Sequence, residues 1–406
     1  MENKIAIVTS GFLPVPATKG GAVENLIVNM INVNENEKKE NFLIYSIYEN
    51  KAIEESKKYK KTDFKFIKVN GAIKAMDKII HLVAKNILKK RNSQSYRYIL
   101  QRLYYLNKVS KDLSENNYKK VLLENHPTQY LCLKWRKNYI KYRDRYYYHC
   151  HNEFVGEYGC HDIIKNTKRV LCVSNYIKKT MKNYIENHNN IIVLRNGIDT
   201  TKFQTNLDCN EKNKIRKKYK IDKNDKVLLY TGRIVPEKGV LELTEAVKKV
   251  KYKDFKLLIV GSSLNELNNK TEYEENVEKN LESIEDKTIF TGFIKYEDMN
   301  KIYKIADIVI IPSIWNDPAP LTIIEALVCG IPIITTNSGG IPEYAVNDSA
   351  IILERNEKLI NNLSNSIDAL LNDENKLEKM RENAKEVSRK LTKEIYYANF
   401  INAIIE

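Results

Sequence analysis

The sequence predicts an α/β protein made of two doubly wound domains in tandem. Short apolar runs alternate with helical patterns along the chain, which is typical of parallel sheets covered by helices. A glycine-containing turn follows the first strand of each half, at 9–21 and at 232–239. Residues 199–225 between the halves are polar and charged, so we place the boundary there. The predicted domains are 1–200 and 201–387, and we consider a helix at about 388–406 that packs back on the first domain.

The apolar runs give the expected order of elements. In the first half, strands are expected at 5–8, 42–47, 121–123, 146–149, 170–173 and 191–194. In the second half they are expected at 227–231, 256–260, 289–290, 308–311 and 331–335, with helices at 240–250 and 323–328. The segment from 374 to 405 is predicted to be helical throughout. Any ligand should lie beyond the carboxyl ends of the strands.

Composition excludes several classes of protein. The chain has 406 residues, 43% of them apolar, so it is neither disordered nor too short for two cores. No apolar run approaches the roughly 20 residues that span a bilayer. The apolar start is too short for a secretory signal, and the six cysteines form no regular framework, so we expect a cytoplasmic protein. The net charge of +15 indicates an anionic partner.

The strongest local pattern follows the strand at 227–231. Gly232 makes a turn, Arg233 and Lys238 follow on one loop, and a helix starts near Gly239. An Arg fork beside a compact Lys charge suits a diphosphate. The alternative is a pair of solvated surface cations.

A second pattern follows the strand at 308–311. Pro320 suits the first position of a helix, and the N–H groups of Leu321 and Thr322 are then free to bind a phosphate. Asp317 in the loop and Glu325 inside the helix are expected to accept hydrogen bonds from different parts of one ligand, such as a hexose and a ribose. The alternative is an acid that only favours the helix dipole.

Taken in order, these motifs resemble glycosyltransferase family 4. The resemblance is carried by Gly232-Arg233 with Glu237-Lys238-Gly239, Thr291-Gly292-Phe293, Pro312-Ser313 through Glu325-Ala326, and Gly330-Ile331-Pro332. It implies the GT-B fold, in which two Rossmann-like domains face a central cleft. It also implies a retaining transfer from a UDP-, dTDP- or GDP-linked sugar without a metal, in surface polysaccharide or glycoconjugate synthesis.

The resemblance assigns roles to residues of the second half. Arg233 and Lys238 match the pair that holds the donor diphosphate, and Glu325 matches the ribose-binding acid of the E-x7-E motif. Asp317 stands where the first glutamate of that motif is usual, so it is one methylene shorter there. Gly232, Leu321 and Thr322 are expected at the diphosphate, and Gly292 and Phe293 beside the nucleobase. Pro320 replaces a glycine that many members have.

The first half carries fewer assignments. Gly20 and Gly21 resemble the family's glycine turn beside the diphosphate, and Asn196 belongs to an N-G-I-D segment that leads into the hinge between domains. His151 matches the family's cleft histidine, a catalytic position, while His126 is a weaker candidate on the acceptor side. His149, His151, Cys150, Cys160 and His161 raise the alternative of a zinc site, but their spacing matches no standard pattern, so we expect no metal.

The basic charge concentrates in residues 71–145. Residues 71–111 hold ten Lys or Arg and one acid, Asp77, interleaved with apolar residues, and 134–145 add six cations. A basic amphipathic pattern favours an anionic membrane surface, which would suit a lipid-linked or saccharide acceptor and a peripheral location at the inner face of the cell membrane. A solvated face over a core is the alternative.

Three rival functions are considered. A sugar-nucleotide epimerase would share the fold, but the two cations and two acids fit a transferase better. A coat or structural protein without turnover is motivated by Asp317. Nucleic-acid binding is motivated only by charge, and no recognised motif supports it. The sequence names neither the base, the sugar nor the acceptor.

Overall fold

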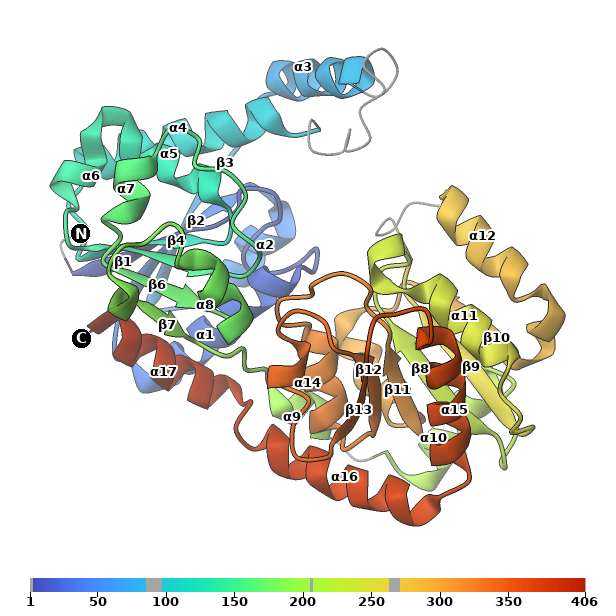
Figure 1. Cartoon of the computed structure of the whole chain (residues 1–406). Coiled ribbons are helices and arrows are strands. Elements are labelled where there is room, and N and C mark those ends of the chain that lie inside the picture. The colour runs from blue at the N-terminus through green and yellow to red at the C-terminus, as the bar shows by residue number, and fades with distance from the viewer. Residues whose placement is uncertain (1–2, 85–96, 205–206, 263–270, 406) are drawn as a thin grey trace. The chain divides into compact units, whose positions relative to one another are not determined.

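Two compact units make up the chain. The computed structural model describes residues 3–84, 97–204, 207–262 and 271–405 (Figure 1). One unit comprises Met1–Arg195 with Tyr396–Glu406, and the other comprises Asn196–Ile395. Each contains one parallel sheet with helices packed against it. The predicted α/β class with two doubly wound domains is confirmed.

The sheet of the first unit has its strand order reversed beside β1. Its strands are β1 (Lys4–Val8), β2 (Asn41–Ile47), β3 (Thr62–Ile67), β4 (Lys120–Glu124), β5 (Tyr146–Cys150), β6 (Arg169–Cys172) and β7 (Ile191–Val193). They lie in the order β3-β2-β1-β4-β5-β6-β7 and all pair in parallel. The chain turns to one side of β1 first and to the other side from β4 onward. In such sheets the gap outside β1 and β4 is the usual place for a ligand.

Helices cover this sheet because the connections between its parallel strands must cross over it. They are α1 (Ala22–Glu37), α2 (Asn50–Ser56), α3 (Gly71–Leu82), α4 (Ile99–Glu115), α5 (Tyr130–Lys134), α6 (Asn138–Lys141), α7 (His161–Lys165) and α8 (Asn175–Met181). The inner face of α1 buries Ile27, Met30 and Ile31 against Ile5 and Ile7 of β1. This packing fixes the start of α1 beside the end of β1.

The second unit repeats the arrangement with six strands. They are β8 (Lys226–Thr231), β9 (Phe255–Val260), β10 (Thr288–Gly292), β11 (Ile308–Ile311), β12 (Ile333–Thr336) and β13 (Ala350–Leu353), in the order β10-β9-β8-β11-β12-β13. The order reverses between β8 and β11. Alternate residues of β8 enter different cores: Val227 and Leu229 pack on one face, Leu228 and Tyr230 on the other.

The helices of the second unit lie on both faces of its sheet. They are α9 (Thr200–Gln204), α10 (Cys209–Lys218), α11 (Val240–Lys248), α12 (Glu272–Asn280), α13 (Met299–Tyr303), α14 (Leu321–Val328), α15 (Leu359–Leu371) and α16 (Glu374–Ser388). The core with Val227 contains Ile323 and Ile324 of α14, and the core with Leu228 contains Leu243 of α11 and Ile367 of α15. Helix α14 is the next helix after β11, and it packs on the face of the sheet that carries Val227 and Leu229.

The prediction of one helix from 374 to 405 is wrong. Helix α16 ends at Ser388, and α17 (Lys393–Ile405) begins after an extended stretch. In that stretch Ile198 N–H donates to the Leu391 carbonyl (3.0 Å) and Lys393 N–H donates to the Ile198 carbonyl (2.8 Å). This pairing interrupts the helix because those backbone groups bond to a neighbouring chain segment.

Helix α17 belongs to the first unit from Tyr396 onward (Figure 1). Tyr396, Tyr397, Phe400 and Ile401 pack in the same core as β1 and α1. The Tyr397 hydroxyl donates to Asn34 Oδ1 at 2.5 Å. The end of the described chain thus completes the core of the domain in which the chain begins.

Strands β3 and β13 are missing from the sequence-based prediction. Both lie at sheet edges. In β3 the polar residues Asp63 and Lys65 interrupt the apolar pattern, whereas β13 is a short run of four apolar residues. Among the described residues, no helix is long and apolar enough to cross a membrane.

Candidate functional site

The loop after β8 is pressed against the loop after β11. Gly239 has φ 70°, and a Cβ at this position would lie 1.9 Å from the Pro312 carbonyl oxygen. Only glycine permits this approach. The Ile314 N–H donates to the Glu237 carbonyl at 3.1 Å, which joins the same two loops. The contact brings one predicted cation, Lys238, to the predicted acid Asp317 of the other loop.

Lys238 and Asp317 form an ion pair through Nζ and Oδ2. The side chain of Asp317 is 6% exposed and that of Lys238 20% exposed. Backbone contacts hold Asp317 in place: Ser338 Oγ accepts from its N–H at 3.3 Å, and its carbonyl accepts from Gly340 N–H at 2.8 Å. Two predicted site residues are therefore brought together, with their charges compensating one another in a mostly buried position.

Arg233 stands apart from this pair. Its side chain is exposed and pairs with no acid among the described residues, while its carbonyl accepts from the Tyr230 hydroxyl at 2.7 Å. Burial raises the pKa of Tyr230, and the charges of Arg233 and Asp317 both act on that phenol. Tyr230 is thus near both groups, and Arg233 carries a free guanidinium at the end of β8. Gly232 beside it bonds through its N–H to the Val260 carbonyl (3.0 Å).

The start of α14 is open. Pro320 occupies the N-cap position and no side chain caps the first turn, in which Leu321 and Thr322 are the first two residues. N–H groups at such a position have no partner within the helix. The Asn196 side chain lies beside this turn, since its Nδ2 donates to the Ala319 carbonyl at 3.4 Å and its Oδ1 is buried without a partner. Asn196 therefore joins the predicted phosphate-binding turn.

Glu325 lies inside the domain, 5% exposed. The Tyr303 hydroxyl donates to its Oε2 at 2.7 Å. Burial raises the pKa of Glu325 to about 7, although the phenols of Tyr303 and Tyr296 act in the opposite direction. The carboxyl of Glu325 is thus engaged by α13, whereas Asp317 is engaged by Lys238.

Gly292 and Phe293 end β10. Gly292 has φ 68° with open space where a Cβ would be, and Phe293 is 47% exposed. The Gly292 carbonyl accepts from Gly261 N–H at 3.0 Å, which ties the end of β10 to the end of β9. An exposed aromatic ring at this edge offers a stacking surface, and no described contact joins it to the Lys238–Asp317 pair.

In the first unit, Gly20 and Gly21 precede α1 with φ of 73° and 105°. The Glu24 carboxyl folds back over this turn, so that a Cβ on Gly21 would lie 2.2 Å from Glu24 Oε2. Ser10 Oγ donates to Glu24 at 3.2 Å. Burial raises the pKa of Glu24 to about 7, with a smaller contribution from the charge of Glu124. Glu24 is a site candidate that the sequence analysis missed.

His151 belongs to a buried cluster with His149 and Glu124. Glu124 Oε2 lies 3.0 Å from His151 Nε2 and 3.2 Å from His149 Nδ1. Burial would raise the pKa of Glu124, but the two imidazoles lower it to about 2. Burial, with the charge of His149, lowers the pKa of His151 to about 4. Glu124 therefore orients His151 through one ring nitrogen.

This cluster is also the group of described residues that could hold a metal ion. One donor atom from each of Glu124, His149 and His151 lies within 4.8 Å of the others. Two imidazoles and one carboxylate fit Zn²⁺. His149 and His151 share one face, because side chains two residues apart on an extended segment point the same way. Cys150 bonds instead to the Asn152 carbonyl (3.1 Å), and His161 to Glu157. Glu124 is the last residue of β4, the strand that pairs with β5. Its position at a strand end was the sequence signal that could have identified it as a site residue.

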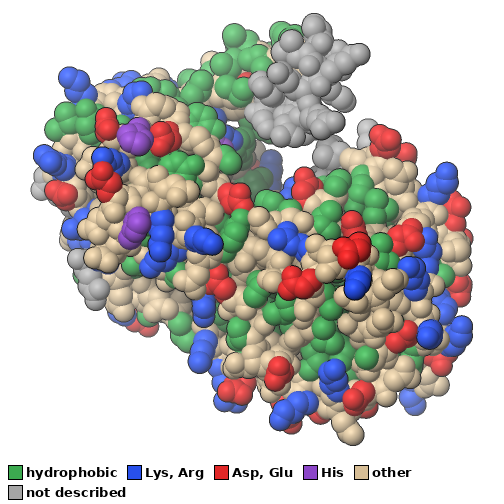
Figure 2. All heavy atoms as spheres, in the orientation of Figure 1, with side chains coloured by type: hydrophobic (Ala, Val, Ile, Leu, Met, Phe, Trp, Pro, Cys, Tyr) green, Lys and Arg blue, Asp and Glu red, His purple; other side chains and the backbone are tan. Residues whose placement is uncertain are grey.

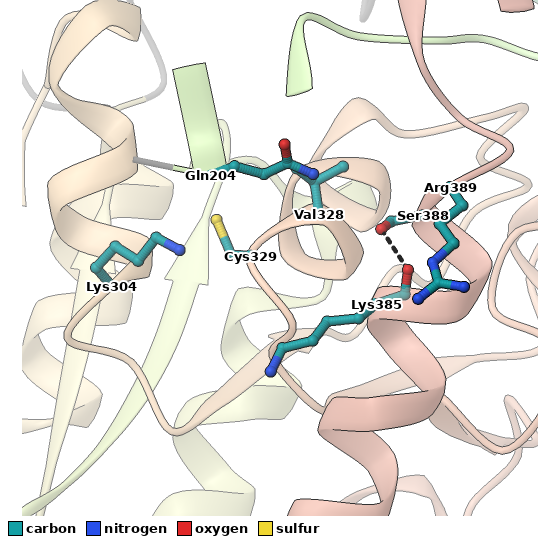
Figure 3. A pocket seen from close by; sticks show the side chains of 7 residues that line it. All are labelled: Gln204, Lys304, Val328, Cys329, Lys385, Ser388 and Arg389. Atoms are coloured by element: carbon teal, nitrogen blue, oxygen red, sulfur yellow. Dashed lines mark hydrogen bonds between the residues drawn. The ribbon is translucent and has the colours of Figure 1, made fainter. Parts of the chain in front are cut away.

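A separate pocket lies beside α14 and α16 (Figure 3). It is lined by Gln204, Lys304, Val328, Cys329, Lys385, Ser388 and Arg389. None of the predicted site residues lines it. The candidate groups lie instead at the carboxyl ends of β8 and β11.

Residues 211–387 match the family model of glycosyl transferases group 1. The matched segment contains the Lys238–Asp317 pair, Arg233, the open start of α14 and Glu325.

Similar proteins in sequence include several that are named as glycosyltransferases. An uncharacterized glycosyltransferase of Methanocaldococcus jannaschii is 29% identical over 177 residues, which are 43% of this chain and 44% of that protein. The lipopolysaccharide 1,2-N-acetylglucosaminetransferase of Salmonella typhimurium is 27% identical over 202 residues, 49% of this chain and 50% of that protein. The chain thus spans about half the length of these curated relatives.

The fold is shared over the full length. The crystal structure of Anabaena HepE in complex with UDP and glucose covers 99% of both chains with a TM-score of 0.74 and 16% identity. At this identity the likeness is one of fold, and it confirms the two-domain α/β architecture of GT-B glycosyltransferases.

We expect Gly239→Ala to destabilise the protein far more than Gly292→Ala. The two glycines have nearly equal φ, so both substitutions cost the roughly 1–2 kcal/mol of left-handed backbone strain. Only the Cβ at 239 meets a backbone oxygen, which adds about 1–3 kcal/mol of overpacking. Urea unfolding of the two variants measures the difference, and equal losses would contradict the proposed role of the Gly239–Pro312 contact.

Glu325→Gln should stabilise the protein at pH 8 and have little effect at pH 4. The protonated carboxyl contributes stability that is fully present below pH 4.5 and is lost as the pH rises through about 7. Gln does not ionise, so it removes that loss, and it still accepts from the Tyr303 hydroxyl. The free energy of unfolding at pH 8 should therefore rise by at most about 3 kcal/mol. Thermal unfolding at both pH values measures it, with the exposed Glu382→Gln as control. A variant less stable than the parent at pH 8 would refute this assignment.

Proposed function

We propose that the protein is a glycosyltransferase of family 4 that moves a sugar from a nucleotide-activated donor to a saccharide or lipid-linked acceptor with retention. The observation that carries the proposal is the buried Lys238–Asp317 pair, held where the strand order reverses between β8 and β11. The group 1 match over 211–387 and the nucleotide complexes of structural neighbours support it. The donor is a UDP-, dTDP- or GDP-linked sugar.

The proposed donor site is built from charge and open N–H groups. Arg233 has a free guanidinium for the diphosphate, and Lys238 is close enough to Asp317 to exchange part of that interaction for a phosphate oxygen. The N–H groups of Leu321 and Thr322 add donors at the positive end of α14. The leaving nucleoside diphosphate gains negative charge as the sugar departs, and fixed cations stabilise that charge most.

The remaining contacts follow from their positions. Asp317 is proposed to bind the transferred sugar, Glu325 the ribose, and Gly292 with Phe293 the base. Glu325 is protonated over part of the neutral range, so it can donate as well as accept. Two cations already stand at the proposed diphosphate site, so no metal is required there. The Glu124–His149–His151 cluster is proposed to act as a protein hydrogen-bond network without an ion.

The first unit is proposed to supply the acceptor side. His151 would contact the donor sugar, with Glu124 fixing its ring. Gly20 and Gly21 would approach the diphosphate through their backbone. Retention is proposed to proceed by departure of the leaving group on the face where the acceptor attacks. A diphosphate oxygen takes the acceptor proton, so the protein contributes position and charge.

Lys238→Ala should abolish transfer and weaken donor binding. The change removes a cation from the diphosphate and leaves the Asp317 carboxylate buried without its partner. Transfer is measured with a panel of nucleotide sugars, in EDTA because no metal is expected, and donor binding by thermal shift. Lys226→Ala, which breaks a surface pair with Glu374, is the control.

Two outcomes would contradict the proposal. Unchanged turnover in Lys238→Ala would remove the diphosphate role of Lys238. Absence of protection by any nucleotide sugar would favour instead a coat or structural protein that keeps this fold without turnover.

We further propose that helix α3 meets an anionic membrane surface. Met76, Ile79 and Leu82 are 54%, 61% and 53% exposed, and hydrophobic side chains gather over α3 in Figure 2. Lys74 and Lys78 on the same helix are exposed. The acid Asp77 is buried, where it accepts from Leu100 N–H (2.9 Å) and Gln101 N–H (3.0 Å). Lys85, Lys89, Lys90 and Arg91 of the same basic segment lie outside the described residues.

Replacing Met76, Ile79 and Leu82 together by Ser should release the protein from vesicles that contain anionic lipid. The three side chains are mostly exposed, so the melting temperature should stay unchanged. Vesicle cosedimentation measures binding, and the exposed Ile140→Ser with Val155→Ser is the matched control. Equal vesicle binding by the α3 variant and its parent would refute the membrane contact.

A further inference from the structure

Arg102 on the first turn of α4 is a half-buried cation without an acid. Among the described residues, no Asp or Glu pairs with it, and its Nε is buried without a hydrogen-bond partner. Burial lowers the pKa of Arg102 to about 10. The Phe12 ring centroid lies 4.1 Å from the guanidinium carbon. Burying a charge that is unpaired costs free energy, so this arrangement suggests that a counter-ion comes from outside the chain.

His126 lies at the same point. Its Nδ1 is 3.2 Å from Thr128 N and 2.8 Å from Thr128 Oγ1, so the neutral ring can hold its proton on Nδ1 and leave Nε2 as an acceptor. Burial, with the charge of Arg102, lowers the pKa of His126 to about 4, which keeps the ring neutral at pH 7. The Nη1 of Arg102 lies 2.9 Å from that Nε2. The His126 ring can therefore accept one bond from Arg102, whose Nε–H still has no acceptor among the described residues.

These groups lie at the ligand edge of the first sheet. Helix α4 leads into the start of β4, so its first turn lies at the opposite edge, where the parallel strands end. Phe12 follows β1, His126 follows β4 and Tyr158 follows β5. These are neighbouring strands at the point where the order reverses. Arg102 and His126 thus stand on the same edge as Gly20, the proposed acceptor side.

Exposed aromatic rings surround Arg102 and His126. Phe12 and Tyr158 are 36% and 48% exposed, and Tyr98, 38% exposed, packs edge-on to Phe12 at 5.5 Å between centroids. The Tyr158 ring lies 6.1 Å from the His126 ring, and its backbone has φ 51°. A tyrosine held in the left-handed region is costly and is typical of functional sites. Apolar ring faces beside charged donors suit a sugar that carries an anionic group.

We propose that Arg102, beside His126, binds an oxyanion, a phosphate or a carboxylate, on the acceptor glycan, with Phe12 and Tyr158 against the sugar. The fork of Arg102 matches either oxyanion, and the His126 ring that it contacts reports the binding. The assignment to the acceptor rests on the proposed transferase function. The binding of an anion at Arg102 does not, so the two are tested separately.

The first experiment observes His126 directly. The chain has six histidines, and the imidazole signal of His126 in a ¹³C-histidine-labelled protein is identified by its loss in His126→Asn. Inorganic phosphate and glucuronate, each titrated at pH 7, should shift this signal to saturation. Arg102→Gln should abolish the shift, and Arg143→Gln, which removes an exposed cation, should leave it intact. Observing His126 separates this site from the proposed diphosphate site, which would also bind phosphate.

Stability gives an independent measurement. If Arg102 is a structural residue held by Phe12 and His126, Arg102→Gln lowers the melting temperature. The proposal expects it to be unchanged or higher without anion, because an unpaired buried cation is removed, and expects phosphate or glucuronate to protect the parent more than the variant. If only one of the two anions gives a saturating shift, that anion identifies the bound group as a phosphate or as a carboxylate. A His126 signal insensitive to both anions, or equally sensitive in both Arg variants, would overturn the proposal.

If transfer is established, the acceptor assignment is tested by kinetics. Arg102→Gln should raise KM for an acceptor that carries a phosphate or carboxylate by about 10-fold or more, the loss of one charge-assisted contact. KM for a neutral analogue and for the donor should stay unchanged. Equal effects on charged and neutral acceptors would show that the anion site serves another ligand.

Discussion

Parallel pairing of the strands is the constraint on which the rest of this structure depends. In both sheets every strand ends at the same edge, and the strand order reverses once, between β1 and β4 and between β8 and β11. Connections diverge at these points, so the backbone leaves room there for loops to meet. The Lys238–Asp317 pair stands at one reversal. Glu24, Glu124 and Arg102 stand at the other. Residues that are distant in sequence lie close together because the strands they follow all end at the same edge of the sheet.

The two edges handle charge differently. In the second unit Lys238 is neutralised by Asp317, so the ligand-free site carries little unbalanced charge apart from the exposed Arg233. In the first unit Arg102 pairs with no acid within the described part of the chain, while Glu24 has a pKa raised to about 7 by its burial. One edge therefore holds a pair that a ligand must rearrange. The other holds groups that a ligand could complete.

Much of this could be predicted from the sequence, and the residues explain where it could not. The central strands are continuous apolar runs, so both sheets were visible, and Gly232 to Gly239 marked the loop that reaches Asp317. Edge strand β3 was missed because Asp63 and Lys65 interrupt its apolar pattern, whereas the four apolar residues of β13 offered a signal that was not used. Glu24, Glu124 and Tyr303 were missed because their significance comes from burial beside a partner far along the chain. Glu325 was recognised, but its bond to Tyr303 depends on the packing of α13.

Helix α17 gives the first domain a boundary that is discontinuous in sequence. Its Tyr396, Phe400 and Ile401 fill the core around Ile5 and Ile27, although nearly two hundred residues of the other unit come between. During synthesis the first domain would have left the ribosome with that apolar surface uncovered while the second domain was still being made. Its final packing is therefore a late event that follows translation of residues 396–405. Until then, this domain exposes part of its apolar core, and transiently exposed apolar surface favours aggregation.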